Sequence, residues 1–256
     1  GLLCQVGGLG ILLVKDFTSI LSQHREARGE ALAALREVYD GRYDRPIGTG
    51  GGRVLTWSGK CGLIAGCTPT IDRHHAVMAA MGERFCFYRL TVSNPQAQAR
   101  RRLQNRRHEE EMRAELAAAT DRVLKGMVDN TGERDQRRDD AIVEWAHFAT
   151  WARTGVERDG YDREVVLMPS VEAPARFAGA LDAMYTGLSA IGVSEVEKWG
   201  VVTKLAWDSV PDLRRRILIE FNKRPHAWLR TTDVTKETSI PRTSAERTCE
   251  DLALLG

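Results

Sequence analysis

A single carboxylate, Asp16, lies two residues after the end of an aliphatic run near the start of the chain. The run Ile11–Val14 predicts a buried strand that ends just before Asp16. An Asp at the C-terminal tip of a central strand is placed to hold the metal ion of a bound nucleoside triphosphate. An Asp that only caps the end of a buried strand is the alternative interpretation of this motif taken alone.

Two further apolar segments also carry polar or charged residues at their ends. Gly62–Gly66 predicts a second strand, which ends in Cys67 and Thr68. The segment Arg84–Leu90 predicts a third strand, with Arg84 at its start and Arg89 near its end. We therefore expect an α/β core whose strand ends hold the residues that do chemistry.

The phosphate-binding loop that would complete such a site, G-x-x-x-x-G-K-[ST], does not occur in the sequence. The glycines at 50–52 are followed by Arg53 and the strand-like Val54–Trp57, so they predict a hairpin turn. The glycine-rich segment 7–10 leads into a strand, whereas a phosphate loop leads into a helix.

The C-terminal segment predicts a helix-turn-helix arrangement. One helix begins at Pro211, a short helix spans Asp233–Thr238, and a last helix spans Arg242–Leu255 after a turn. The last helix would enter the major groove of DNA. Residues at its start suit phosphates and base edges, namely Arg242, Thr243, Ser244 and Arg247. The alternative is the same arrangement used for protein contacts.

The middle of the chain predicts mostly helices. The segment Pro95–Asn130 predicts one charged, exposed helix, in which a run of arginines between 100 and 107 precedes Glu109, Glu110 and Glu111. This pattern favours a solvated face over a phosphate contact. A second helix, Pro174–Ile191, carries Arg176 in its first turn.

Composition narrows the class of protein. The chain has 256 residues, 43% of them hydrophobic, and a formal net charge of +2, so any basic surface must be local. The five cysteines form no C-x-x-C pair and four lie in apolar runs, which predicts reduced thiols and a cytoplasmic protein. The apolar run before Lys15 is too short for a membrane span and lacks a basic region, so no membrane anchor is expected.

From about Gly10 onward, these motifs and their order resemble the later half of an AAA+-type P-loop ATPase, of the bacterial and phage type with a C-terminal winged-helix DNA-binding domain. By this resemblance, Ile11–Asp16 is similar to the Walker B strand and Gly62–Thr68 to the sensor-1 strand. The segment Met81–Leu90 is similar to the arginine-finger segment. The sequence departs from the family at Lys15-Asp16-Phe17, where Asp-Glu is usual, so Asp16 stands at either the Asp or the Glu position.

The resemblance implies a role for each site residue. Asp16 would handle Mg²⁺ or the attacking water, and Thr68, or Cys67 beside it, would take the sensor-1 role. Arg84, with Arg89 as the alternative, would reach into the site of a neighbouring subunit in a homo-oligomer. Arg176 would serve as the sensor-2 arginine near the γ-phosphate.

We therefore expect an α/β partial P-loop core at residues 1–93, a helical lid at 94–209 and a winged-helix domain at 210–256. The core lacks the segment with the phosphate loop, and the wing is truncated. We expect the chain to be the C-terminal portion of a DNA-associated ATPase of the helicase, helicase-loader or regulator type. In the full-length context this protein would use ATP and Mg²⁺. Its expected partner is double-stranded DNA. The alternative is a non-catalytic DNA-binding regulator with a degenerate ATPase core.

Overall fold

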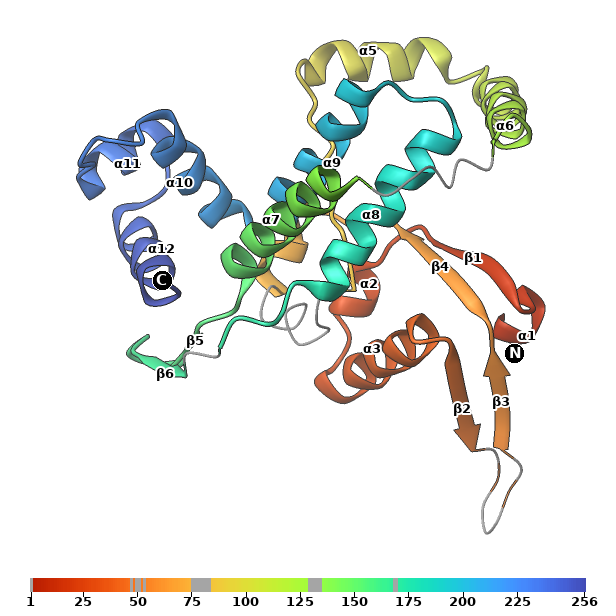
Figure 1. Ribbon diagram of the computed structural model, residues 1–256, viewed down its shortest axis with the longest axis horizontal. Helices are drawn as coiled ribbons and strands as arrows, with labels where there is room; N and C mark the ends of the chain where they lie inside the picture. Colours follow the sequence, from red (N-terminus) through yellow and green to blue (C-terminus); the bar gives the residue numbers. More distant parts are fainter. Residues whose placement is uncertain are drawn as a thin grey trace.

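The chain adopts a mixed α/β fold that is mostly helical, with three small two-stranded sheets among the described residues (Figure 1). This computed structural model describes residues 2–46, 48, 52, 54–74, 84–128, 135–167 and 170–256. None of the helices in these ranges combines the length and the apolar character that a bilayer crossing requires.

The N-terminal part holds two of the sheets. It comprises α1 (Leu2–Val6), β1 (Leu9–Val14), α2 (Thr18–Leu21), α3 (Arg25–Tyr39), β2 (Arg42–Pro46), β3 (Val54–Ser58), β4 (Lys60–Ala65) and the 3₁₀ helix η1 (Pro69–His74). Strands β1 and β4 pair in parallel, from Leu9 opposite Lys60 to Val14 opposite Ala65. Strands β2 and β3 form an antiparallel hairpin. The strands predicted at Ile11–Val14, Val54–Trp57 and Gly62–Gly66 are confirmed, whereas most of the predicted glycine-rich turn lies outside the described residues.

Among the described residues, only one face of the parallel sheet is covered. Leu12, Val14 and Leu63 on one face are partly buried, and α3 lies beside β4 (Figure 1). On the other face, side chains of Leu9, Ile11, Leu13 and Ile64 are 79%, 62%, 74% and 61% exposed. Parallel sheets are normally covered on both faces. The bare apolar face is therefore a surface that the described residues leave without a packing partner.

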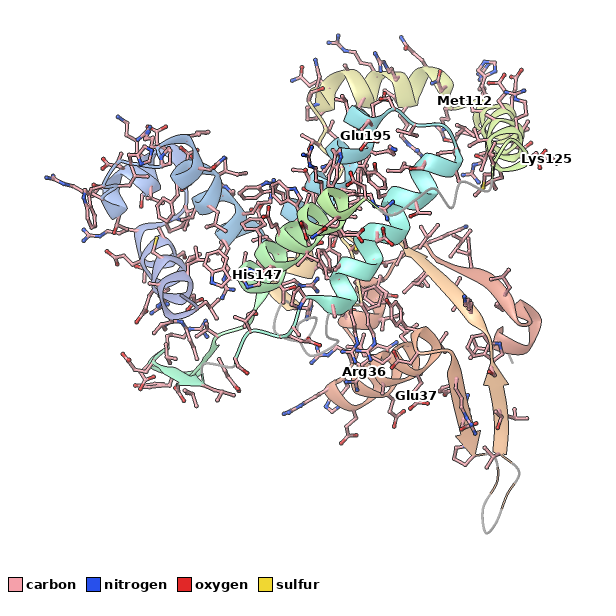
Figure 2. All side chains as sticks on the ribbon, in the orientation of Figure 1. Arg36, Glu37, Met112, Lys125, His147 and Glu195 are labelled. Atoms are coloured by element: carbon pink, nitrogen blue, oxygen red, sulfur yellow. The ribbon has the colours of Figure 1, made fainter. Side chains whose placement is uncertain are left out.

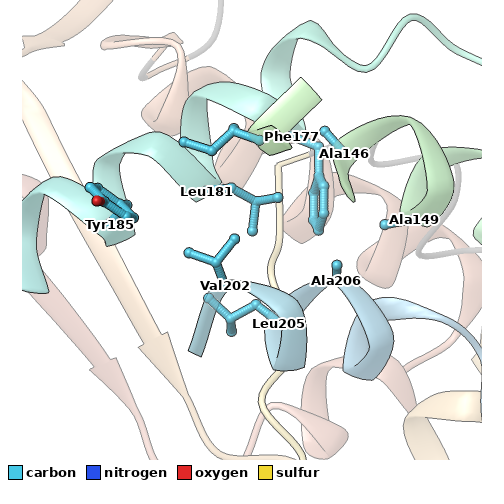
Figure 3. Packing of buried hydrophobic residues seen from close by; sticks show 9 residues of the cluster. Ala146, Ala149, Phe177, Leu181, Tyr185, Val202, Leu205 and Ala206 are labelled. Atoms are coloured by element: carbon cyan, nitrogen blue, oxygen red, sulfur yellow. The ribbon is translucent and has the colours of Figure 1, made fainter. Parts of the chain in front are cut away.

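The largest core lies between three long helices, α7 (Gln136–Arg153), α8 (Ala175–Ala190) and α9 (Glu195–Ser209). Phe177, Leu181 and Val202 are fully buried at its centre, against the small side chains of Ala146 and Ala206 (Figure 3). Ser194 begins α9 with a capping box to Glu197, which satisfies backbone groups at that helix end. The predicted helix at Pro174–Ile191 is confirmed as α8.

The single helix predicted at Pro95–Asn130 is wrong, because the chain forms two helices there. These are α5 (Pro95–Asn105) and α6 (Glu109–Lys125). The first turn of α6 contains Glu109, Glu110 and Glu111, and acidic side chains stabilise the positive end of a helix dipole. The acidic run therefore favours a new helix start, where the sequence interpretation continued the old helix.

The strand predicted at Arg84–Leu90 is also wrong. The backbone N–H of Phe87 donates to Ser209 Oγ at 3.0 Å, and that of Arg89 donates to Asp208 Oδ2 at 2.7 Å. Phe85 and Phe87 pack on the N-terminal core around Phe17 and Leu21, whereas Cys86 packs on the helical core. The alternation that predicted a strand reflects two cores on either side of an irregular segment.

The C-terminal part is a three-helix unit made of α10 (Asp212–Lys223), α11 (Thr231–Thr238) and α12 (Arg242–Leu254). Ile217, Val234, Ile240 and Ala245 form its own buried core. Ser239 ends α11 with φ of 56°, in the left-handed region, and thereby turns the chain toward α12. The three helices predicted in this segment are confirmed. A short hairpin, β5 (Glu157–Arg158) and β6 (Val165–Leu167), lies beside the unit (Figure 1).

We predict that Phe177→Ala destabilises the chain by about 3–5 kcal/mol, because it removes a fully buried ring from the centre of the helical core. Urea unfolding followed by circular dichroism measures the change. Val196→Ala in α9 is the control, since Val196 is 83% exposed and should cost no more than about 0.5 kcal/mol. Equal losses from the two variants would contradict the position of this core.

Candidate functional site at the strand ends

The carboxyl ends of β1 and β4 form one continuous edge. Beyond the last paired residues, Gly66 N–H donates to Val14 O at 2.9 Å and Phe17 N–H donates to Gly66 O at 2.7 Å. A Cβ atom at Gly66 would lie 2.8 Å from Lys15 O, so only glycine permits this close approach. The segments that carry Asp16 and Thr68 are therefore held side by side.

Two threonines join these segments directly. Thr68 N–H donates to Thr18 Oγ1 at 3.1 Å, and the two hydroxyl oxygens lie 3.3 Å apart. Asp16 is exposed, and one of its carboxylate oxygens accepts a hydrogen bond from Thr18 N–H at 3.0 Å. The structure thus brings Asp16 and Thr68 together through Thr18. The other carboxylate oxygen of Asp16 has no hydrogen-bond partner in the part of the chain that the structure describes.

Cys67 lies within electrostatic range of the same carboxylate. Although the residue is exposed, its thiol is partly desolvated, and this burial is the main cause that raises its pKa. The negative charges of Asp72 and Asp16 raise the pKa further, whereas Arg89 lowers it. Cys67 is therefore a protonated thiol at neutral pH.

Arg89 is fixed by acidic groups of its own chain. Its guanidinium donates two hydrogen bonds to the Asp72 carboxylate, both at 2.7 Å, and others to Asp208 O and Val210 O. Burial opposes the positive charge, but the bonds and charges of Asp72, Asp212 and Asp208 outweigh it and raise the pKa of Arg89. The charge of Arg89 acts on Cys67, and its guanidinium donates four hydrogen bonds to Asp72, Asp208 and Val210.

Arg84 lies in a different environment from the strand ends. Its side chain is only 10% exposed, forms an ion pair with Asp40 at 2.8 Å and stacks over the Tyr39 ring. These contacts hold it against the end of α3. That Arg84 reaches into the site of a neighbouring subunit stays a prediction. To do so, Arg84 would have to break its ion pair with Asp40.

Arg176 lies in the first turn of α8 and forms an ion pair with Glu172 at 2.9 Å. Its side chain is half exposed, and no contact joins it to the strand ends in the part of the chain that the structure describes. The structure thus brings together Asp16, Cys67, Thr68 and Arg89, and it places Arg84 and Arg176 elsewhere.

The start of α12 forms a second candidate surface. Arg242, Thr243 and Arg247 are exposed and Ser244 is partly buried, whereas Ala245 faces the core of the three-helix unit. Arg242 donates to Glu246 at 2.8 Å, and this bond raises the pKa of the guanidinium. The four predicted residues therefore lie within the first two turns of α12, whose Ala245 packs on the core.

Buried arginines hold α12 against the rest of the chain. Arg158 of β5 donates to Asp251 and Glu250, and Arg214 of α10 donates to Ala152 O and also to Asp251. Burial lowers the pKa of Arg214, while Asp251 opposes that effect. These contacts fix the orientation of the exposed face of α12.

The strand ends suit a magnesium–nucleotide complex better than a free metal ion. Mg²⁺ in such complexes is held by one or two protein carboxylates, with phosphate oxygens and water supplying the other ligands. Asp16 supplies one carboxylate, with the Thr18 and Thr68 hydroxyls beside it. No cluster of three or more His, Cys, Asp or Glu side chains able to hold a metal alone occurs among the described residues.

Comparison of the chain with protein-family models, with curated proteins and with solved structures found no match. The functional argument therefore depends on the geometry described above.

Sequence reasoning missed several residues of these sites. Thr18 joins the two strand ends, and Asp72 and Asp208 bind Arg89. Thr18 lies two residues after Asp16, so a search for hydroxyls just beyond a strand-end carboxylate would have found it. Asp208 lies 119 residues from Arg89, and no local pattern signals such a contact.

We predict that Asp16→Asn speeds alkylation of Cys67 by iodoacetamide at pH 8 by roughly twofold. The Asp16 charge disfavours the thiolate, so its removal lowers the pKa of Cys67 and increases the reactive fraction. Peptide-resolved mass spectrometry measures the rate. Cys61 near the start of β4 is the internal control, and its alkylation rate should not change. An unchanged or slower Cys67 rate would show that Asp16 and Cys67 are not neighbours.

Proposed function

We propose that this chain is the C-terminal portion of a DNA-associated, ATP-hydrolysing protein with an AAA+-type core. One observation carries the proposal. The ends of two adjacent parallel strands bring together Asp16, Thr18 and Thr68, which is where open α/β sheets bind their ligands.

The uncovered face of the β1–β4 sheet supports the same proposal. Leu9, Ile11, Leu13 and Ile64 are exposed there, and both outer strand edges are unpaired among the described residues. A complete P-loop core would place further strands and helices at these positions. The strand that carries the phosphate loop would pair with a free edge of this sheet.

In this proposal Asp16 is the ligand of the magnesium ion that accompanies ATP, or the group that orients water. Thr68 would donate a hydrogen bond to a phosphate oxygen, with Thr18 fixing the position of its backbone. Bound Mg²⁺ would neutralise charge on the transferred phosphoryl group. Arg84 and Arg89 would act only in a homo-oligomer, after rearrangement of the ion pairs that they form in the single chain.

The three-helix unit supports DNA binding. Its core of Ile217, Val234, Ile240 and Ala245 holds α11 and α12 in a helix-turn-helix arrangement, with Arg242 and Arg247 exposed at the start of the second helix. We propose a winged-helix type of domain that lays the start of α12 in the major groove.

A non-catalytic DNA-binding regulator is the second candidate, and one observation favours it. The two arginines that could complete a hydrolytic site, Arg84 and Arg89, are both held by acids of their own chain. A core that retains its fold without catalysis would show the same ion pairs. This candidate shares the DNA-binding surface and differs in having no magnesium–nucleotide site at Asp16.

We predict that duplex DNA binding depends on α12 and not on the arginine run between residues 100 and 107. The pair Arg242→Ala and Arg247→Ala should weaken binding at least tenfold and reduce the salt dependence of log Kd by up to about two phosphate contacts. Gel-shift titrations of the whole chain at two salt concentrations measure both quantities.

The matched control for this titration is the pair Arg101→Ala and Arg106→Ala, which removes the same charge from an exposed segment near Glu109. This pair should reduce affinity much less. Equal losses from the two pairs would show that α12 is not the main DNA contact.

A further inference from the structure

The loop between α10 and α11 leaves a tryptophan completely exposed. Trp228 is 102% exposed, and no hydrogen bond or ring contact engages its indole among the described residues. The chain has six tryptophans, and the other five are buried or partly buried. Tryptophan is seldom left wholly in water, and exposed rings of this kind are typical of surfaces that bind a partner. The three-helix unit that carries this loop stands at one side of the molecule, and side chains project from it into the solvent (Figure 2).

The backbone on both sides of Trp228 is held in place. Leu229 packs on the core of the three-helix unit, whereas Trp228 and Arg230 on either side of it are exposed. This is the alternation of an extended chain, and Arg230 has extended dihedral angles, with φ of −79° and ψ of 152°. The N–H of Arg230 donates to the Asp233 carboxylate at 3.1 Å, and the N–H of Ala227 donates to the carbonyl of residue 224 at 3.1 Å. The indole of Trp228 and the guanidinium of Arg230 are therefore displayed from one fixed stretch of chain.

The charge around Trp228 is positive. The segment 222–230 contains no Asp or Glu, and its basic residues are Lys223, Arg224, His226 and Arg230. Two acids of the adjoining helices pair with the first two of them, Glu220 with Lys223 at 2.6 Å and Glu237 with Arg224 at 3.5 Å. In the part of the chain that the structure describes, no ion pair engages Arg230. The guanidinium nearest to Trp228 in the sequence is thus available to an anionic partner.

We propose that the segment 222–230 binds single-stranded nucleic acid, with one base stacked on the Trp228 ring and neighbouring phosphates held by Arg230 and Arg224. An aromatic platform flanked by cations suffices for such binding, because every base has a π-face and every nucleotide a charged phosphate. The contact is additional to the duplex contact proposed for the start of α12 and does not depend on it.

The chemistry of the segment favours a single strand over other partners. In a duplex the bases are stacked on one another, so none is free to cover the indole. The core of a protein interface is depleted of charge, whereas Trp228 has cationic residues on both sides. A membrane-binding segment presents a broad apolar face, and here the residues next to Trp228 are Ala227, which is small, and Leu229, which packs inward.

Anisotropy titrations of a labelled oligodeoxythymidylate with the whole chain test the proposal. The unsubstituted chain should bind it, and Trp228→Ala should weaken the affinity by about tenfold or more. Trp228→Phe keeps an aromatic platform and should stay within about threefold of the unsubstituted affinity. Arg230→Ala should lower the salt dependence of log Kd by about one phosphate contact. Because the side chains of Trp228 and Arg230 are exposed, none of these variants should alter folding.

Tyr161→Ala is the matched control. Tyr161 is 98% exposed, but its turn carries Asp159, Asp162 and Glu164, so this ring should not contribute to binding. A chain that does not bind the oligonucleotide would overturn the proposal, including one that uses Trp228 to bind vesicles containing phosphatidylserine. Equal losses from Trp228→Ala and Tyr161→Ala would also overturn it. So would an equal loss of duplex affinity in Trp228→Ala, since the ring would then not distinguish unpaired bases.

Discussion

The arrangement of the molecule depends on the ion pair between Arg89 and Asp72. Asp72 belongs to η1, next to the strand ends, and Arg89 also contacts Asp208 at the end of α9. The backbone N–H of Asp212, at the start of α10, donates to Asp72 as well. One partly buried cation thus joins η1, the helical core and the C-terminal unit. Loss of either partner would leave a partly buried charge uncompensated, which is strongly destabilising.

This constraint explains why the segment around Arg89 is irregular. Lys204 Nζ donates to both Arg89 O and Asp208 Oδ2, and Arg153 donates to Phe85 O. Side chains of the helical core therefore satisfy backbone groups that a neighbouring strand would satisfy in a sheet. The same contacts commit Arg89 to the interior. A nucleotide bound at the strand ends would contact Asp16, Thr18 and Thr68, whereas Arg89 is already bonded to Asp72 and Asp208.

Local sequence patterns predict the helices and strands that are determined by residues close together in the sequence. The strands at Ile11–Val14 and Gly62–Gly66, the helix at Pro174–Ile191 and the three C-terminal helices follow from apolar periodicity and turn residues. The Arg84–Leu90 segment has the alternation of a strand, and only its distant partners in α9 determine that it is not one. The sequence does not predict the break between α5 and α6, because an acidic run fits the interior of a charged helix as well as the first turn of a new one.

The same limit applies to the candidate site: residues placed by local structure could be predicted, and contacts between distant segments could not. Asp16 and Thr68 follow visible strands, so the sequence could place them at one edge of the sheet. The ion pairs of Arg84 with Asp40 and of Arg89 with Asp72 depend on how separate elements pack. No spacing rule gives such pairs, and they determine whether an arginine is available to a ligand.

The central claim is that a magnesium–nucleotide complex binds at the carboxyl ends of β1 and β4. Nuclear magnetic resonance of the isotope-labelled chain with excess ATP, and with Mn²⁺ in place of Mg²⁺, tests it most directly, because paramagnetic broadening reports even weak binding. The account predicts that the backbone amide signals of Asp16, Thr18 and Thr68 broaden first, and that Asp16→Asn abolishes the effect. Broadening centred on another part of the chain, or unchanged in Asp16→Asn, would contradict it.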